Sequence, residues 1–461
     1  MVIAVTQPGV RHEHALKLEA APAPWVPLAF FLSATAALVA AFAVASLHPA
    51  AFLRHWVHNG TVLTALHLFV LGWGTTLAMG AVYQMAPVVL HARLYSERLA
   101  LVHLGVHAAG VALLVTGFGW LHTPRIIAGA SLLMTSVLVF AFHLALTLRG
   151  RAHPDRVGAG MAIAAAYLVL TATWGLTLAL SLRWGFIRAT GPVTGSHLAL
   201  GAGGWFTVLI AFVSLKLTPL FAVGAPPPAR AADPVLAALS AVPLGLALAG
   251  SFLPPAARGP AVRALVAVGA VAALLYARLV WRSAPRRAHR RLEPPVRFAL
   301  AGSALFAALA VVGAAGYAGL APWLFSRPER LIAWVYAALV GWVGTVTIGQ
   351  LYRILPFIVW LERFRKHTPG EQLPFLHEIA DRRLGDALLA LWLGGLALGV
   401  AGLWVRSAPL VRAGMAAGLG GSLLLAYTEA RALTVWRAGV RWPKLPPRPA
   451  PAAVGQARLR G

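Results

Sequence analysis

The sequence predicts an all-α, polytopic membrane protein of about twelve transmembrane helices in three pseudo-repeated four-helix units. Hydrophobic residues make up 59% of the 461 positions and charged residues 11%, whereas a soluble domain carries roughly 25% charged residues. Most of the surface must therefore face lipid. The apolar runs reach about 20 residues or more, the length of a spanning helix, and they lack the period-2 alternation of barrel strands. The third observation is a motif that recurs once in each third of the chain.

The apolar runs define the expected spans in chain order. The first unit, 25–148, is expected to contain 25–47, 60–90, 98–120 and 125–148. The second unit, 157–282, is expected to contain 157–182, 195–224, 234–253 and 260–282. The third unit, 296–436, is expected to contain 296–320, 330–361, 384–405 and 408–436. A polar cytoplasmic tail, 1–24, precedes the spans, and a basic, Pro-rich cytoplasmic tail, 437–461, follows them. The first run is longer than a signal-peptide core, so we expect it to be an uncleaved span.

The excess of basic residues predicts the orientation. The formal net charge is +26, from 39 Lys+Arg against 13 Asp+Glu. In a soluble chain this would indicate nucleic acid, but here the basic residues lie in loops and tails, where they set topology. Clusters such as Arg149/Arg151/Arg156 and Arg363/Arg365/Lys366 fall on the side of the N-terminus. We therefore expect a multi-pass protein of the plasma (inner) membrane with both termini in the cytoplasm. There are no cysteines, which excludes disulfides, thiolate zinc sites and cysteine-ligated iron–sulfur clusters.

A repeated motif marks the second span of each unit. It reads Gly72-Trp73 with Tyr83-Gln84-Met85-Ala86-Pro87, Gly204-Trp205 with Leu215-Lys216-Leu217-Thr218-Pro219, and Gly341-Trp342 with Tyr352-Arg353-Ile354-Leu355-Pro356. The glycine should let a neighbouring helix approach closely, and the proline should end or kink the helix. Gln84, Lys216 and Arg353 each precede the proline by three residues. They are expected either to cap freed carbonyls and snorkel or to line a central pathway.

Two histidines near the start of these spans are candidate cofactor ligands. A histidine inside a membrane span indicates function by default, and imidazole is a common ligand of haem iron and copper. His67 lies six residues before Trp73, and His197 lies eight before Trp205. The third unit has Trp334 and Tyr336 there instead. The alternative is that both histidines are hydrogen-bonded packing residues.

Three further histidines form a second candidate cluster. His103 and His107 share one helix face, and His143 lies at a similar depth on the next span. They could bind a metal or haem or relay protons, or they could form an interfacial polar face. Glu429 is the only carboxylate placed well inside a span, and it is either ion-paired or interfacial. Such scarcity argues against a proton-coupled carrier, and no Walker loop, hydrolase elbow or HExxH motif is present.

Taken together, this layout resembles subunit I of the haem–copper oxidases, a superfamily that includes the nitric oxide reductases. Motif-level similarity is confined to the stretch from His67 to Pro87 with Ser96 after it. By position, His67 matches that family's second-helix ligand to the low-spin haem, and His197 loosely matches its sixth-helix copper ligand. The family's histidine pair on the seventh helix has no counterpart in 234–253, and its two tenth-helix histidines have none in 330–361. The resemblance thus implies the fold without a complete binuclear centre.

These observations leave three functional hypotheses. The first is a divergent haem–copper-oxidase-like protein that binds at most one haem or copper and acts in respiratory electron transfer, assembly, or NO or copper handling. Its partners would be the lipid bilayer and other respiratory subunits or a cytochrome c, and whether it is an enzyme stays open. The second is a transporter or channel with a threefold pathway. The third is a cofactor-free scaffold of a respiratory complex.

Overall fold

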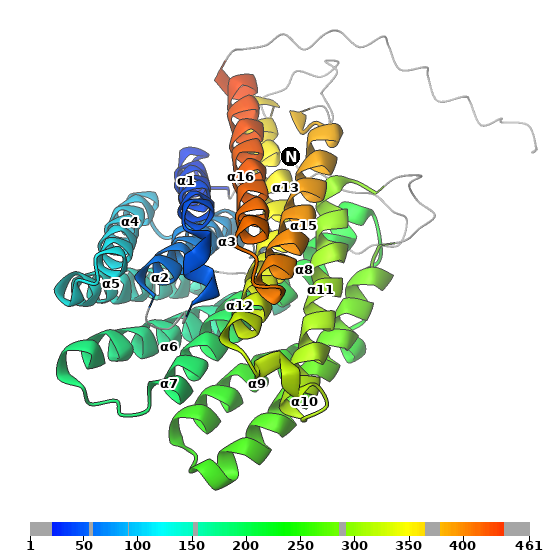
Figure 1. Ribbon diagram of the computed structural model, residues 1–461. Helices are drawn as coiled ribbons and strands as arrows, with labels where there is room; N and C mark the ends of the chain where they lie inside the picture. The colour runs from blue at the N-terminus through cyan, green and yellow to red at the C-terminus, as the bar shows by residue number, and fades with distance from the viewer. Residues whose placement is uncertain are drawn as a thin grey trace, which may run out of the picture.

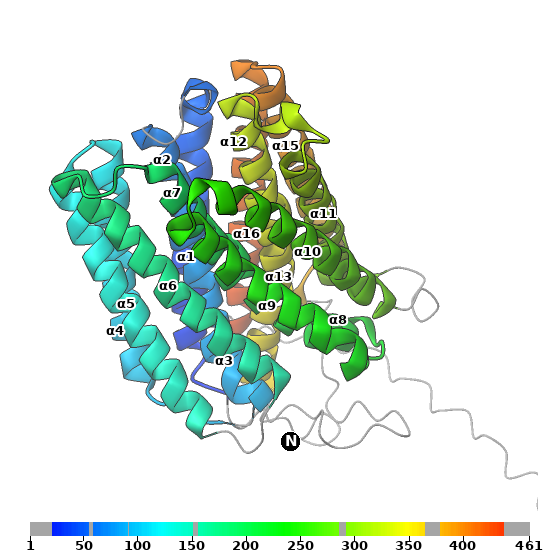
Figure 2. The ribbon, with the colours of Figure 1, turned by 90° about the horizontal axis from the view of Figure 1, so that it is seen from below.

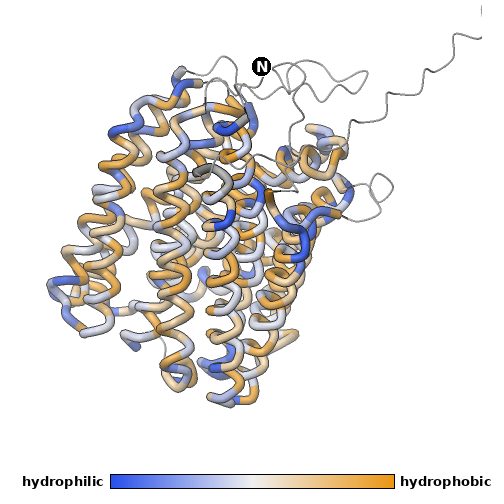
Figure 3. The backbone as a smooth tube through the Cα atoms, turned by 90° about the horizontal axis from the view of Figure 1, so that it is seen from above, coloured by the Kyte–Doolittle hydropathy of each residue, from blue (hydrophilic) through white to orange (hydrophobic). Residues whose placement is uncertain are grey.

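A computed structural model describes residues 21–54, 59–90, 92–150, 155–284, 292–364 and 379–437. Over these residues the fold is all-α, and twelve helices are long and apolar enough to cross a membrane. Hydrophobic residues run along the bodies of the helices, and most hydrophilic residues gather near their ends (Figure 3). The chain is therefore a polytopic membrane protein, as the sequence predicts. The predicted tails fall almost entirely on 1–20 and 438–461, outside the described residues.

Each unit contains four long helices, and the second of them, the central helix, has a π-helical segment in its middle. Unit 1 contains α1 (Trp25–Leu47), the continuous helix α2–η4–α3 (Gly60–His67, Leu68–Thr75, Thr76–Leu90), α4 (Glu97–Gly119) and α5 (Thr123–Arg149), with a short turn η3 (Pro49–Leu53) after α1. Unit 2 contains α6 (Arg156–Trp184), α7–η5–α8 (Thr190–Leu198, Ala199–Val208, Leu209–Ala222), α9 (Ala229–Phe252) and α10 (Pro255–Arg282). Unit 3 contains α11 (Pro294–Tyr317), η6 (Pro322–Phe325), α12–η7–α13 (Pro328–Tyr336, Ala337–Gly344, Thr345–Phe364), α15 (Arg382–Trp404) and α16 (Ala408–Arg437).

The helix ends differ from the predicted spans by up to five residues. The largest differences lie at the starts of α7, α9 and α10, each of which begins five residues earlier than predicted. In α10 the reason is that Pro255 occupies the first helical position, where its missing N–H costs nothing and its fixed φ suits the helix. A proline therefore begins this helix where the apolar pattern alone placed a loop.

The units close into a ring around their second helices. The last helix of each unit packs along the first helix of the next, in the pairs α5 with α6, α10 with α11, and α16 with α1. The second helices lie inside and contact one another through η4, η5 and η7. They are the most buried spans, at 61, 67 and 72% of their apolar windows, against 28–50% for the others. Figures 1 and 2 show α1 and α16 side by side although they stand at opposite ends of the chain.

Each central helix contains a π-helical segment around its Gly-Trp pair. At the C-terminal end of each segment a threonine hydroxyl donates to the carbonyl five residues earlier: Thr76 to Leu71 at 3.0 Å, Thr207 to Ala202 at 2.8 Å and Thr345 to Val340 at 3.2 Å. A π-turn holds one extra residue, so it widens the helix and leaves carbonyls for other donors. The apolar pattern alone does not predict these segments.

The glycine before each tryptophan allows the close approach that the motif predicts. A Cβ atom on Gly72 would lie 2.7 Å from Ala37 Cβ of α1, and one on Gly204 would lie 2.3 Å from Tyr167 Cδ1 of α6. The added Cβ of Gly341 would meet Leu396 at 3.0 Å. All three distances are tighter than ordinary side-chain contacts. This part of the prediction is confirmed.

In every unit, a glycine and a phenylalanine also pack against each other between the first helix and the central helix. In unit 2 the two residue types have changed helices. In unit 1, a Cβ on Gly80 of the central helix would lie 2.4 Å from Phe30 Cβ of the first helix. In unit 3, Gly349 and Phe298 repeat this arrangement at 2.3 Å. In unit 2 the glycine is on the first helix, and a Cβ on Gly160 would lie 2.3 Å from Phe212 Cγ of the central helix. One phenyl ring and one glycine thus fill the same space in every unit.

The three motif tryptophans form a belt between the central helices. Trp205 Nε1 donates to Thr75 Oγ1 at 3.2 Å, and Trp342 Nε1 donates to Thr207 Oγ1 at 3.0 Å. Each bond runs from one unit to the position two residues after the tryptophan of the preceding unit. For Trp73 that position is Gly344, and the buried Trp73 Nε1 has no hydrogen-bond partner among the described residues. Trp392 of α15 occupies the space, since a Cβ on Gly344 would lie 2.7 Å from its ring.

The polar residues before the motif prolines lie in three separate places. Lys216 Nζ pairs with Asp155 at 2.7 Å, and Arg353 Nη1 pairs with Glu293 at 2.7 Å. Both acids immediately precede the first helix of their own unit. Gln84 is buried, and no residue in the described ranges hydrogen-bonds to its Oε1. This geometry agrees with anchoring at the helix ends.

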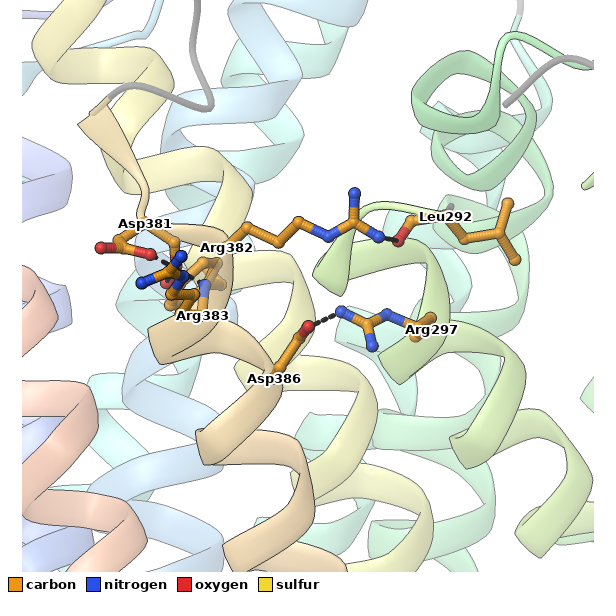
Figure 4. Close-up of polar contacts among 7 residues, drawn as sticks. Leu292, Arg297, Asp381, Arg382, Arg383 and Asp386 are labelled. Atoms are coloured by element: carbon orange, nitrogen blue, oxygen red, sulfur yellow. Dashed lines mark hydrogen bonds and ion pairs between the residues drawn. The ribbon is translucent and has the colours of Figure 1, made fainter. Parts of the chain in front are cut away.

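Further ion pairs join the first and third helices of the units near the same end. Figure 4 shows Arg297 of α11 paired with Asp386 of α15, and Arg382 donating to the carbonyl of Leu292. In unit 2, Arg156 pairs with Asp233 at 2.7 Å. In unit 1, the N–H of Ala23 donates to Glu97 Oε1 at 2.8 Å. One carboxylate near the start of each third helix thus contacts the start of the first helix.

Candidate functional site

His67 and His197 lie near each other across the junction of units 1 and 2. His67 occupies the last turn of α2, and His197 the last turn of α7. The imidazoles of His67 and His197 lie within electrostatic range of each other. The sequence predicted each as a ligand on its own, and the fold brings them together.

Each of these imidazoles is held through Nδ1 alone. His67 Nδ1 donates to the Leu63 carbonyl at 2.8 Å, and His197 Nδ1 donates to the Thr171 carbonyl of α6 at 3.0 Å. Because a carbonyl only accepts, Nδ1 of each neutral ring carries the proton and Nε2 keeps its lone pair. Neither Nε2 atom has a hydrogen-bond partner in the described part of the chain. Metal-binding histidines are oriented in this same way.

Small and aromatic neighbours fix the two rings. The Phe118 ring of α4 lies 4.8 Å from the His67 ring between centroids, at 41°. A Cβ on Gly175 of α6 would lie 3.0 Å from His197 Cε1. Gly175 therefore leaves the space that the His197 imidazole occupies. Both rings are only partly buried.

His103 and His107 lie in a buried hydrogen-bond chain. Tyr83 Oη contacts His103 Nδ1 at 3.0 Å, and Ser136 Oγ contacts both His103 Nε2 and His107 Nδ1 at 3.0 Å. His107 Nε2 then contacts the Leu71 carbonyl of η4 at 3.2 Å. All four side chains are almost completely buried. The chain links the π-segment of unit 1 to α3, α4 and α5.

The Leu71 carbonyl fixes the direction of every bond in this chain. It can only accept, so a neutral His107 carries its proton on Nε2 and accepts from Ser136 at Nδ1. Ser136 has one proton, so it accepts from His103 Nε2, and His103 Nδ1 accepts from the Tyr83 hydroxyl. All four protons therefore point from Tyr83 towards the π-segment. No ring nitrogen of His103 or His107 is left for a metal.

His143 lies beside this chain. Its ring centroid is 4.8 Å from that of Tyr83, and its Nε2 accepts from the Ser96 N–H at 3.0 Å. Its Nδ1 is buried, and nothing in the part of the chain that the structure describes hydrogen-bonds to it. In the described part of the chain, no group of three or more His, Cys, Asp or Glu residues could hold a metal ion. The predicted cluster of His103, His107 and His143 thus exists in space as a hydrogen-bonded group.

Glu429 of α16 forms a hydrogen bond that links the last helix to the first helix, α1. Its Oε1 accepts from Thr35 Oγ1 of α1 at 2.7 Å, and its side chain is buried. Arg431, two residues on, pairs instead with Asp381 at 3.3 Å. Among the described residues, Glu429 is therefore hydrogen-bonded to a hydroxyl and not ion-paired with Arg431, whereas its depth in the membrane stays a prediction. The partner Thr35 is 394 residues away in the chain, a distance that no local pattern reveals.

Sequence reasoning missed Tyr83 and Ser136 as partners of the histidines. Tyr83 was read only as part of the motif, and Ser136 lies in an otherwise apolar span. The usable signal was a serine on α5 facing two histidines of α4 across an expected hairpin.

No protein-family model matches this chain, and no curated protein matches its sequence.

Proposed function

We propose that this membrane protein binds one redox-active metal centre, a copper ion or a haem iron, between units 1 and 2 through His67 and His197. We also propose that it is a divergent relative of subunit I of the haem–copper oxidases, which its architecture resembles. The observation that carries it is the pair of imidazoles from two central helices, each tied by Nδ1 to a carbonyl and each with a bare Nε2. Such a centre would supply one-electron transfer.

The donor set fits a centre that takes two imidazoles from the protein. Imidazole suits copper and iron, and haem iron accepts axial histidine. The described residues offer no third His, Cys, Asp or Glu to complete a larger site. A four-coordinate structural zinc site needs more ligands. The neutral rings favour metal binding because a proton on Nε2 would block it.

The role we propose is electron transfer or copper handling in the plasma membrane, with respiratory subunits or a cytochrome c as partners. Reduction of oxygen or NO at the family's usual centre is not part of the proposal, because the seventh- and tenth-helix histidines are missing. We further propose that both termini face the cytoplasm, because basic clusters gather on that side.

The test is metal and haem analysis of protein purified in detergent. We expect close to one copper or one haem per chain, and loss of it in both His67→Ala and His197→Ala. His48→Ala is the control, because His48 is exposed and its side chain makes no hydrogen bond in the described structure. Elemental analysis distinguishes copper from iron, and a reduced-minus-oxidised spectrum identifies haem. Metal-free protein with an intact fold would refute the proposal and favour the cofactor-free scaffold.

The transporter or channel hypothesis has less support in the geometry. The tryptophan belt fills the space between the central helices, since Trp73, Trp205 and Trp342 are at most 3% exposed. Lys216 and Arg353 are engaged in ion pairs with the ends of separate first helices. A threefold pathway would need these groups to face one axis. Solute uptake by vesicles containing the protein would support this alternative.

A further inference from the structure

Glu429 is a buried carboxyl group that no cation neutralises in the described structure. Its side chain is only 3% exposed. Arg431, the nearest basic residue on α16, pairs with Asp381 at 3.3 Å instead. An ionised carboxylate that is buried without a cation carries a large desolvation cost. The surroundings of Glu429 therefore suit a carboxyl group that holds a proton.

The hydrogen bond from Thr35 determines which oxygen of Glu429 carries that proton. Thr35 Oγ1 donates to Glu429 Oε1 at 2.7 Å, so Oε1 is the accepting oxygen and the proton of the neutral carboxyl group lies on Oε2. No residue in the described ranges hydrogen-bonds to Oε2. A buried O–H group without an acceptor is costly, so a further acceptor is expected beside it.

A small hollow beside Glu429 has room for that acceptor. It measures about 20 Å³ and lies between α13, the start of α15 and α16. One water needs roughly 10–15 Å³ and two to four polar partners. Glu429, Tyr352, Asp381 and Thr428 are among the residues that line the hollow. The Tyr352 hydroxyl donates to the Asp381 carbonyl, and its oxygen can still accept. The hollow can therefore hold one water that accepts from Glu429 Oε2.

The hollow reaches exposed polar groups at the ends of the helices. Asp381 immediately precedes α15, and its Oδ1 accepts from the N–H of Arg383 at 2.8 Å (Figure 4). Asp381 and Arg431 both line the hollow. Although they pair with each other, their side chains remain 35 and 41% exposed. The hollow thus joins the buried carboxyl group to groups that contact water.

Few other titratable groups face Glu429 from the elements packed against α16. In the described structure these are Tyr352 of α13, Asp381 before α15, and Arg431 of α16 itself. Helix α1 contributes the Thr35 hydroxyl, and η3 contains no titratable residue. Because Arg431 and Asp381 neutralise each other, neither sign of charge dominates beside Glu429.

We infer that Glu429 is a proton-binding site that exchanges its proton, through this hollow, with the water at the start of α15. A water in the hollow accepts the proton from Oε2 and passes it to the water outside. The carboxylate that is left keeps its bond from Thr35, and the reverse transfer restores the carboxyl group. This site is separate from His67 and His197 and needs no metal there.

The test is infrared spectroscopy of the full chain in a detergent without ester groups, while the buffer is changed from H₂O to D₂O. At neutral pH we expect a C=O band of a protonated carboxyl group that is absent from Glu429→Gln. Deuterium should replace the Oε2 proton and lower the frequency of this band. Raising the pH should remove it. Glu329→Gln is the matched control and should leave the band unchanged, because the buried Glu329 is paired with Arg406 at 3.1 Å.

A second pair of variants tests the route of exchange. Ala380 lines the hollow, so Ala380→Phe should narrow it and slow the deuterium shift. Ala109→Phe is the size-matched control, because Ala109 is exposed on α4, and it should leave the rate unchanged.

Thr35→Val keeps the test decisive if Glu429→Gln does not fold. It retains the carboxyl group and should raise the frequency of the band, because the C=O group loses its donor. Three results, each in folded protein, would overturn the inference: no band that responds to either variant, a band that D₂O leaves unshifted, or an unchanged exchange rate in Ala380→Phe.

Discussion

The tryptophan belt allows the contribution of one kind of hydrogen bond to be measured by comparison within a single molecule. Trp73, Trp205 and Trp342 occupy equivalent positions and are all buried. Trp205 and Trp342 donate to threonine hydroxyls, whereas Trp73 Nε1 meets no acceptor within the described structure. Replacing each with phenylalanine removes the same N–H and a similar volume. The difference among the three variants therefore reports the hydrogen bond.

The expected magnitude follows from the membrane setting. Side-chain hydrogen bonds between membrane helices contribute about 0.6 kcal/mol on average and up to about 1.7 kcal/mol. Trp205→Phe and Trp342→Phe should lose this amount in addition to a packing cost that all three variants share. Trp73→Phe removes a donor that is already unsatisfied, so it should lose only the packing part. We thus expect Trp73→Phe to be the most stable of the three by about 0.6–1.7 kcal/mol.

The assay is unfolding of purified protein in mixed micelles by increasing SDS, followed by far-ultraviolet circular dichroism. The midpoint of each variant is compared with that of the parent. Thr207→Val gives an independent check, because it removes both the acceptor of Trp342 and the bond from the Thr207 hydroxyl to the Ala202 carbonyl. Added to Trp342→Phe, it should therefore cost only the second of these two bonds. Equal destabilisation of all three tryptophan variants would refute the reasoning, as would Trp73→Phe being the least stable.

Three other predictions follow from the packing and the polar contacts. Gly349→Ala should destabilise the fold by about 1–3 kcal/mol through overpacking, whereas Gly105→Ala, where an added Cβ meets nothing within 4 Å, should be neutral or stabilising in the same SDS titration. The N–H of Arg383, followed by the paired Arg431, holds the pKa of Asp381 below its usual value. The stabilisation is therefore fully present above about pH 4 and is lost as the pH falls through the lowered pKa, so Asp381→Asn should flatten the acid dependence of the unfolding midpoint. Ser136→Ala should break the histidine chain at its centre and change the imidazole tautomers seen by nitrogen NMR, whereas unchanged tautomers would contradict the bond directions given above.

The sequence predicted the class of fold and the twelve spans because lipid imposes a strong, local signal. Each span must be apolar over its own length, and each motif glycine had to meet a neighbouring helix. The sequence also places His67 and His197 correctly on the second helices of units 1 and 2. What each of them touches depends on which units adjoin, and no window of sequence carries that information.

The polar contacts were harder to predict because they join distant segments. Lys216 was expected to cap or line a pathway, yet its partner Asp155 lies 61 residues before it. The π-segments depend on where threonine and third-helix donors meet a carbonyl, as when Trp392 Nε1 approaches the Val340 carbonyl at 3.2 Å. These contacts exist only once the helices of a unit have packed against one another.

The contact between Thr35 and Glu429 bears on how the chain is assembled during synthesis. The first helix enters the bilayer long before the last one is made, so its seam must face lipid, or other proteins in the membrane, until α16 arrives. If synthesis stopped before α16, the Thr35 hydroxyl and the face of α1 that packs against α16 would stay uncovered. Completion of the ring is thus a natural checkpoint, since a quality-control protease that inspects the bilayer could tell a finished molecule from a truncated one by that seam.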